Sequence, residues 1–205
     1  MRLILLLLIL LASPVPMASA QVGPSDPPRI ITERNGAITN HRVEGSLAPS
    51  REIGCIAVAE ADNAMTPPDL YIGVRKCLDQ DRFERAVELF ALAGLYGNFD
   101  AMRVTDRSAG QAKTVLIMGT FSTVGPERKD RFRQALERMN ANPDSLTALC
   151  RSVDRVGHPG YYPAYMILHG MKAFTGNPHD GALAPDFDAA ATWTSLRSNY
   201  LHCPG

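Results

Sequence analysis

The segment DRFERAVELFALAGLYGNFDA, from Asp81 to Ala101, carries the strongest pattern in the chain. Its apolar residues recur at three- and four-residue spacing, which places on one helix face Phe83, Ala86, Val87, Phe90, Leu92 and Ala93. Either Asp79 or Asp81 is expected to cap this helix, because a short carboxylate accepts unpaired backbone N–H groups. The segment therefore predicts a packed amphipathic helix.

The glycines of the same segment predict where that helix ends. Gly94 and Gly97 suit a helix C-terminus, where glycine adopts the left-handed conformation at little cost. A second helix would then begin at Asn98 or Phe99. Small residues at contact positions allow two helices to approach closely, so the sequence predicts an αα-hairpin here.

The first twenty residues have the features of a secretory signal peptide. Arg2 precedes the apolar run Leu3 to Ala12, and Ala18-Ser19-Ala20 forms a small-residue cleavage site. We expect a cut after Ala20 and a periplasmic or secreted protein, the alternative being an uncleaved N-terminal anchor. No membrane span is expected after cleavage, since the later apolar runs are short.

The net charge and the cysteine content indicate which partners are not expected and whether disulfides form. The chain has 21 basic and 21 acidic residues; the first twenty contain Arg2 and no acid, so the rest has a formal charge of −1. That balance argues against nucleic acid as a partner. Four cysteines behind a signal peptide predict two disulfides, with three pairings open. We favour Cys55–Cys77 with Cys150–Cys203, because each would tie a terminal segment to the helical body.

The rest of the sequence predicts an all-α domain. Residues 21–50 are expected to form an N-terminal arm: either a short β-hairpin around Asn35-Gly36, typical of a type I′ turn, or an extended segment. Residues 51–205 are expected to form one domain of about seven helices. Besides the opening helix and the one expected to begin at Asn98 or Phe99, the sequence predicts five more helices. They are Asp69–Leu78 with Thr66 as cap, Pro126–Asn140, a helix capped by Asn142-Pro143, Tyr161–Phe174 and Asp186–His202.

The opening stretch resembles a Sel1-like repeat, a relative of the tetratricopeptide repeat. The positions that carry the resemblance are Ala86, Leu89, Phe90, Ala93, Gly94, Gly97 and Ala101, and the match spans about one unit, Leu70 to Ala101. No second unit is recognisable, and solenoids need about three. The resemblance implies a helix-hairpin scaffold of a kind often used to bind other proteins, with no inherited catalytic residues.

Two groups of residues are candidate binding sites. Asp100, Arg103, Asp106 and Arg107 recur at one-turn spacing and could bind a polar ligand or a partner; as an intrahelical ion-pair ladder they would contribute only tenths of a kcal/mol per pair. The second group is aromatic and surrounds a predicted helix start; its members are Tyr161, Tyr162, Tyr165 and His169. Tyrosine suits binding surfaces, although the same cluster would serve as an aromatic core.

The chemistry that is missing favours a role without catalysis. The sequence contains no GxSxG, HExxH, P-loop, GxGxxG or CxxC motif, so we expect neither a metal nor a cofactor. The first hypothesis is a protein-binding module of the envelope or exterior, such as an immunity- or inhibitor-type protein. A small cell-envelope hydrolase using Glu84 or Asp100 with His169, and a disulfide-stabilised structural domain, are the alternatives.

Overall fold

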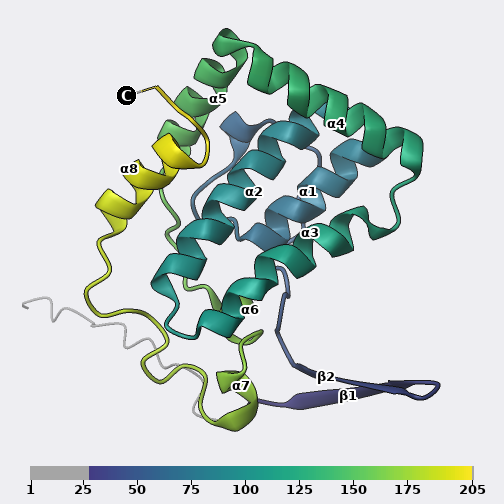
Figure 1. Ribbon diagram of the computed structural model, residues 1–205, viewed down its shortest axis with the longest axis vertical. Coiled ribbons are helices and arrows are strands. Elements are labelled where there is room, and N and C mark those ends of the chain that lie inside the picture. The colour runs from purple at the N-terminus through teal and green to yellow at the C-terminus, as the bar shows by residue number, and fades with distance from the viewer. Residues whose placement is uncertain (1–27, 205) are drawn as a thin grey trace, which may run out of the picture.

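The computed structural model describes residues 28–204 and places an exposed β-hairpin beside a body of helices (Figure 1). The predicted all-α class with a short N-terminal hairpin is confirmed. The predicted signal peptide and the predicted cut after Ala20 lie outside this range.

The hairpin consists of β1 (Ile30–Asn35) and β2 (Ile38–Val43), paired antiparallel. Its turn differs by one position from the predicted one. Gly36 and Ala37 form the two-residue loop, and Gly36 has a positive φ of 60°. A type I′ turn needs a positive φ at both loop residues, and Ala37 does not have one, so this is a type II′ turn.

Two long helices form the centre of the body. α1 (Pro67–Asp79) follows Thr66 and begins with proline, as predicted. α2 (Phe83–Arg103) returns antiparallel to it and presents to the core Ala86, Val87, Leu89, Leu92, Ala93, Leu95, Tyr96 and Phe99. The helix hairpin therefore exists, but its first member is the preceding helix.

α2 passes through Gly94 and Gly97 without a break, so the prediction that a new helix begins at Asn98 or Phe99 is wrong. These glycines serve close packing instead. A Cβ on Gly94 would overlap the hydroxyl of Tyr200, and one on Gly97 would lie 3.1 Å from Lys113 Cγ. The predicted aspartate cap is also wrong: Arg82 is the N-cap residue, and Asp81 pairs with Arg128 at 3.0 Å.

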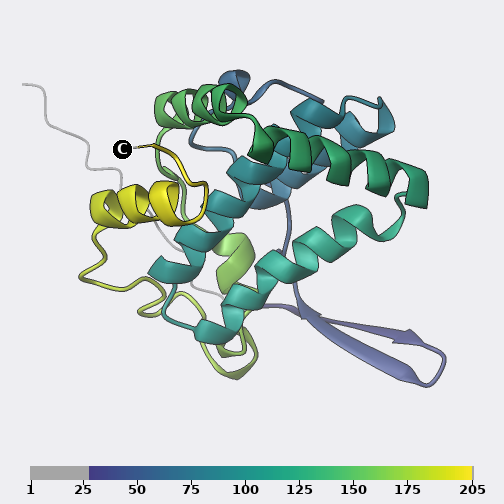
Figure 2. The ribbon, with the colours of Figure 1, turned by 45° about the horizontal axis from the view of Figure 1, so that its top comes forward.

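The remaining elements surround this pair (Figures 1 and 2). They are, in chain order, the 3₁₀ turns η1 (Val58–Glu60) and η2 (Arg107–Gln111) and the helices α3 (Ala112–Ser122), α4 (Pro126–Ala141), α5 (Pro143–Val156), α6 (Ala164–Ile167), α7 (Lys172–Thr175) and α8 (Ala189–Asn199). The predicted side-chain cap of α5 is confirmed, since Asn142 Oδ1 accepts from the backbone N–H groups of Asp144 and Ser145.

One long predicted helix is replaced by two short ones. The segment expected to be helical from Tyr161 to Phe174 contains only α6 and α7. Pro163 is the N-cap residue of α6, and no helix continues across His169 and Gly170. The apolar spacing of this segment arises because its side chains fill a second core cluster with Val104 and Ala109, not because the backbone stays helical.

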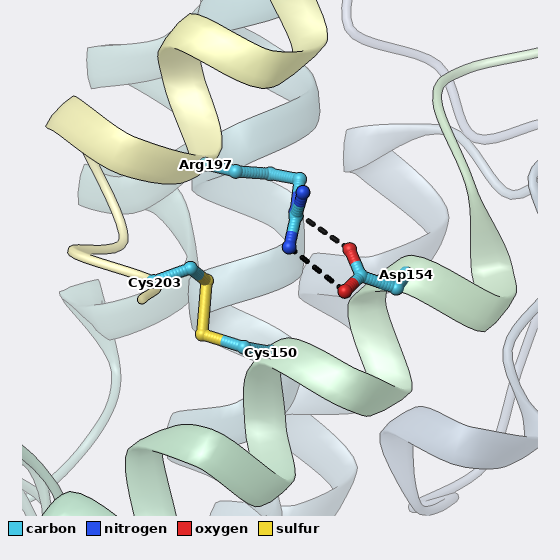
Figure 3. The surroundings of a disulfide bond; sticks show 4 residues. All are labelled: Cys150, Asp154, Arg197 and Cys203. Atoms are coloured by element: carbon cyan, nitrogen blue, oxygen red, sulfur yellow. Dashed lines mark hydrogen bonds and ion pairs between the residues drawn. A yellow bond between two sulfur atoms is a disulfide. The ribbon is translucent and has the colours of Figure 1, made fainter. Parts of the chain in front are cut away.

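Both favoured disulfides are present: Cys55–Cys77, with Cα atoms 4.6 Å apart, and Cys150–Cys203, with Cα atoms 5.7 Å apart. The first ties the loop before η1 to α1. The second ties the chain after α8 to α5, where Arg197 and Asp154 form an ion pair beside it and Arg197 Nη2 donates to Asp154 Oδ2 at 2.8 Å (Figure 3). The two disulfides fit an extracellular or periplasmic protein.

Candidate functional site

Four of the predicted site residues meet inside the protein. The side chain of Asp100 is completely buried, and its Oδ1 accepts from Arg103, with an Nη2–Oδ1 distance of 2.7 Å. Its Oδ2 accepts from the hydroxyls of Tyr161 at 2.9 Å and Tyr165 at 2.8 Å. The sequence predicted one candidate site with Asp100 and Arg103 and a second with the tyrosines. It could not show that the two sets of residues are in contact.

Arg103 completes this cluster from the end of α2. Its Nη2 also donates to the backbone carbonyl of Tyr161 at 2.8 Å. Its guanidinium lies over the rings of Phe99 and Tyr161, with centroid distances of 5.4 and 5.3 Å. Every charged group of the cluster therefore has a partner, which is the condition under which a buried ion pair is tolerated.

The cluster alters the ionisation of its members. Burial raises the pKa of Asp100 to about 6, although Arg103 and the two tyrosine hydroxyls act in the opposite direction. Burial also raises the pKa of Tyr161 and of Tyr165 well above the ordinary tyrosine value, and the negative charge of Asp100 adds to the effect. Both phenols therefore remain protonated donors at neutral pH.

The other predicted site residues lie apart from this cluster. Arg107 is exposed at the start of η2. Tyr162 is exposed, and its hydroxyl lies 2.9 Å from His179 Nδ1. His169 Nδ1 lies 3.0 Å from the hydroxyl of Ser46, and burial lowers the pKa of this histidine.

The arrangement does not assemble a hydrolytic site from the acids and histidine that were considered. Asp100 is enclosed, so neither water nor a substrate reaches its carboxylate. Glu84 is on the surface, where it pairs with Arg138 at 3.0 Å and lines a 370 Å³ cavity between α2, α4 and α5. His169 is engaged with Ser46. The three groups thus belong to three different environments, and Asp100 with its partners acts as a structural tie.

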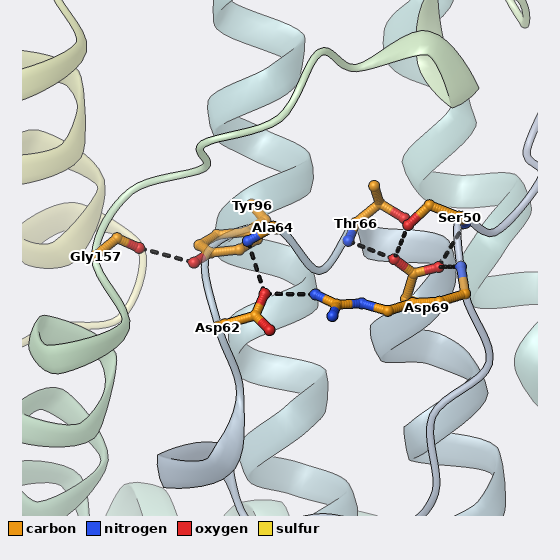
Figure 4. Close-up of polar contacts among 8 residues, drawn as sticks. Ser50, Asp62, Ala64, Thr66, Asp69, Tyr96 and Gly157 are labelled. Carbon is orange, nitrogen blue, oxygen red and sulfur yellow. Dashed lines mark hydrogen bonds and ion pairs between the residues drawn. The ribbon is translucent and has the colours of Figure 1, made fainter.

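A second buried carboxylate, missed from the sequence, organises the chain before α1 (Figure 4). Asp69 accepts from the backbone N–H groups of Ser50, Arg51 and Thr66 and from the Ser50 hydroxyl, at 2.7 to 3.0 Å. Burial alone would raise its pKa, but these donors outweigh burial and lower it. A signal existed in the sequence, because an acid three residues after Thr66 completes a capping box.

An apolar groove of 350 Å³ lies between α1 and α3 and is here called the α1–α3 groove. The segment that links the hairpin to α1 forms its third wall. Ten residues line it: Leu47, Pro49, Pro68, Tyr71, Ile72, Arg75, Val115, Leu116, Gly119 and Thr120. Seven of these are apolar side chains, so the groove favours apolar contact.

The outer face of α3 continues this apolar surface. The helix contains one charged residue, Lys113, whose Nζ donates to Asn98 at 2.6 Å. Val115 is 39% exposed, Met118 is 65% exposed, and a Cβ on Gly119 would have no neighbour within 4 Å. A surface helix with a single charged residue that leaves large apolar side chains in water is unusual. The short apolar run Val115–Met118 was the available signal in the sequence.

Comparisons with known proteins return no matching family, no matching curated protein and no matching solved structure. Among residues 28–204, no helix combines the length and apolar character needed to cross a membrane. Nor does that part of the chain hold three or more His, Cys, Asp or Glu side chains placed to bind a metal ion together.

Proposed function

We propose that this protein binds another protein of the cell envelope or exterior through the α1–α3 groove and the exposed face of α3. The observation that carries the proposal is Met118, a large apolar side chain left 65% exposed beside an apolar groove. Contiguous exposed apolar surface is typical of interaction sites, whereas single scattered apolar residues are not.

The lining of the groove indicates which part of a partner would enter it. Arg75 is its charged side chain, and this guanidinium is already paired with Asp79 at 3.1 Å and bonded to Thr123. The groove thus offers no unpaired charge to an incoming group. We expect an amphipathic helix whose apolar side chains fill the groove, because helix-in-groove binding relies on such anchors.

The position of Gly119 also favours a helix of the partner as the segment that binds in the groove. This glycine lies at the lip of the groove with open space above it, so a partner backbone can approach α3 closely at this point. Val115, one turn earlier, and Met118 would then flank the approaching helix. A purely structural domain would have no reason to keep this surface apolar, which favours binding over that alternative.

The cellular location belongs to the same proposal. A signal peptide over residues 1–20, cut after Ala20, would deliver the chain to the periplasm or the exterior, and its two disulfides suit an oxidising compartment. The α1–α2 hairpin is consistent with the resemblance to one Sel1-like or tetratricopeptide unit, a scaffold associated with protein binding.

The test compares two exposed methionines. Met118→Glu places a charge on the exposed face of α3, next in sequence to the groove residue Gly119, while Met171→Glu makes the same change at a 61% exposed site on another segment of the chain. The mature chain and both variants are used to capture proteins from the native cell envelope. We expect one stoichiometric partner with the parent and with Met171→Glu, and a loss of at least about tenfold in affinity with Met118→Glu, equivalent to about 1.4 kcal/mol.

A photo-reactive amino acid at position 118 provides the direct readout. It should crosslink to the same partner, and the crosslinked peptide of that partner should have helical apolar spacing. Equal capture by both glutamate variants would show that the partner binds elsewhere and would refute the groove as the site. Circular dichroism spectra of the variants control for folding.

A further inference from the structure

The β-hairpin is unusual because it projects from the helical body as a two-stranded sheet (Figures 1 and 2). Val43 at its base is buried and Ile31 is half-buried, whereas the other strand residues are exposed. Ile38 near the tip is 64% exposed. A two-stranded hairpin is only marginally stable in water without further strands or packing, so this one lacks most of the support that such sheets need.

The register shows which backbone groups of β1 are free. Asn35 and Ile38 flank the two-residue turn, and Glu44 N–H donates to the Arg29 carbonyl at 2.8 Å. Hydrogen-bonded pairs alternate along an antiparallel ladder, so odd-numbered residues of β1 bond to β2. The N–H and C=O groups of Ile30, Thr32 and Arg34 therefore point away from β2, along an edge that pairs with no other strand of residues 28–204.

We propose that two copies of this protein associate through this edge, forming a four-stranded antiparallel sheet with its twofold axis at Thr32. Thr32 would then face Thr32 of the partner subunit, and Ile30 would face Arg34 of the partner subunit. Such a contact is isologous, because the same strand serves both subunits. It uses a different surface from the α1–α3 groove and is independent of the function proposed there.

The side chains of β1 are compatible with this pairing. Thr–Thr is a favourable cross-strand pair, and no two like charges stand directly opposite each other. The charged Glu33 would face Ile31 of the partner subunit while keeping its ion pair with Arg42 at 3.0 Å inside its own hairpin. The equivalent pairing through β2 would place His41 against His41 of the partner subunit, which makes β1 the better edge.

Two threonines on opposite edges of the same hairpin provide a matched test. Proline removes a backbone N–H and is tolerated only where that N–H is unpaired within the sheet. Thr32→Pro removes an outward donor from β1, and Thr39→Pro removes an outward donor from β2, opposite Arg34 in the register. Both variants keep the ladder inside the hairpin.

Sedimentation measurements over a range of concentrations should show a dimer for the mature chain and for Thr39→Pro. Thr32→Pro should weaken the dimer by at least about tenfold. Residues 28–204 contain no free cysteine, so Thr32→Cys should give a covalent dimer on oxidation while Thr39→Cys should not. The groove variant Met118→Glu should dimerise normally.

Several results would overturn the proposal. These are a parent chain that stays monomeric at all concentrations, a Thr32→Pro variant that dimerises like the parent, and crosslinking at position 39 but not at position 32. Loss of the dimer in both proline variants would place the contact elsewhere in the hairpin and would equally refute the β1 edge.

Discussion

Tyr165 donates its hydroxyl to Oδ2 of Asp100 over 2.8 Å, joining residues separated by 65 positions in the sequence. Tyr161 donates to the same oxygen, and Arg103 occupies the other one. These contacts fasten the segment before and within α6 to the end of α2. The sequence identified these residues as candidates for binding a ligand or partner, but in the structure they bind one another.

Replacing Tyr165 with phenylalanine should destabilise the protein by about 1.5–3 kcal/mol, because a hydrogen bond to a buried carboxylate is lost. The ring still fills its place in the core, so the effect isolates the hydroxyl. Denaturant unfolding of Tyr165→Phe measures it. Tyr162→Phe, at an exposed tyrosine, is the control and should change stability by less than about 0.5 kcal/mol. Equal effects in both variants would contradict a special role for the Asp100 contact.

Asp100 should impose a recognisable pH dependence on stability. Its folded pKa of about 6 lies above the ordinary value of 3.8, so the folded state binds the proton more tightly than the unfolded state. Stability from this group is therefore greatest below pH 3.8 and falls as the pH rises to about 6, by at most about 3 kcal/mol. Carboxyl ¹³C NMR should show a midpoint near pH 6 for Asp100. A midpoint below 4 would mean that Arg103 outweighs burial.

The two disulfides should differ in their contribution to stability. Loop-closure entropy predicts about 3 kcal/mol for Cys55–Cys77, which spans 22 positions, and about 4 kcal/mol for Cys150–Cys203, which spans 53. Paired Cys→Ala variants of each disulfide, compared by denaturant unfolding, test both values. A larger loss from the shorter loop would show that native-state contacts, rather than chain entropy, decide the order.

Gly94→Ala should be destabilising by about 1–3 kcal/mol, the usual range for inserting a methyl group into a packed contact. The new methyl would overlap the hydroxyl of Tyr200. Adding Tyr200→Phe removes that hydroxyl, so the double variant should recover part of the loss. Thermal unfolding of both single variants and the double variant gives the coupling energy. Additive effects would mean that Tyr200 is not what excludes a side chain at position 94.

Local signals in the sequence predicted the elements that depend on local physics. Thr66-Pro67 and Asn142-Pro143 mark helix starts because proline and a capping residue act within one turn, and α1 and α5 begin there. The same reasoning failed at Gly94, because a glycine inside a helix and a glycine that ends one look alike. What distinguishes them is Tyr200, more than a hundred residues away.

The candidate site was harder to predict than the fold. Asp100 and Arg103 were identified as a pair one turn apart, but their burial depends on Tyr161 and Tyr165 arriving from another part of the chain. The α1–α3 groove escaped notice for the same reason, since its walls come from three separate segments. A sequence pattern shows which residues share one face of one helix. The Asp100 cluster and the α1–α3 groove are each formed by residues from several segments, so no single pattern reveals them.

The pairing of the cysteines has a consequence for biogenesis. Each cysteine bonds to the next one along the chain, Cys55 to Cys77 and Cys150 to Cys203. A polypeptide that emerges N-terminus first into an oxidising compartment can close the first disulfide before the second pair appears. Oxidation in order of emergence would then yield the native bonds directly, and a chain secreted in this way would not need a disulfide isomerase to correct misplaced pairs.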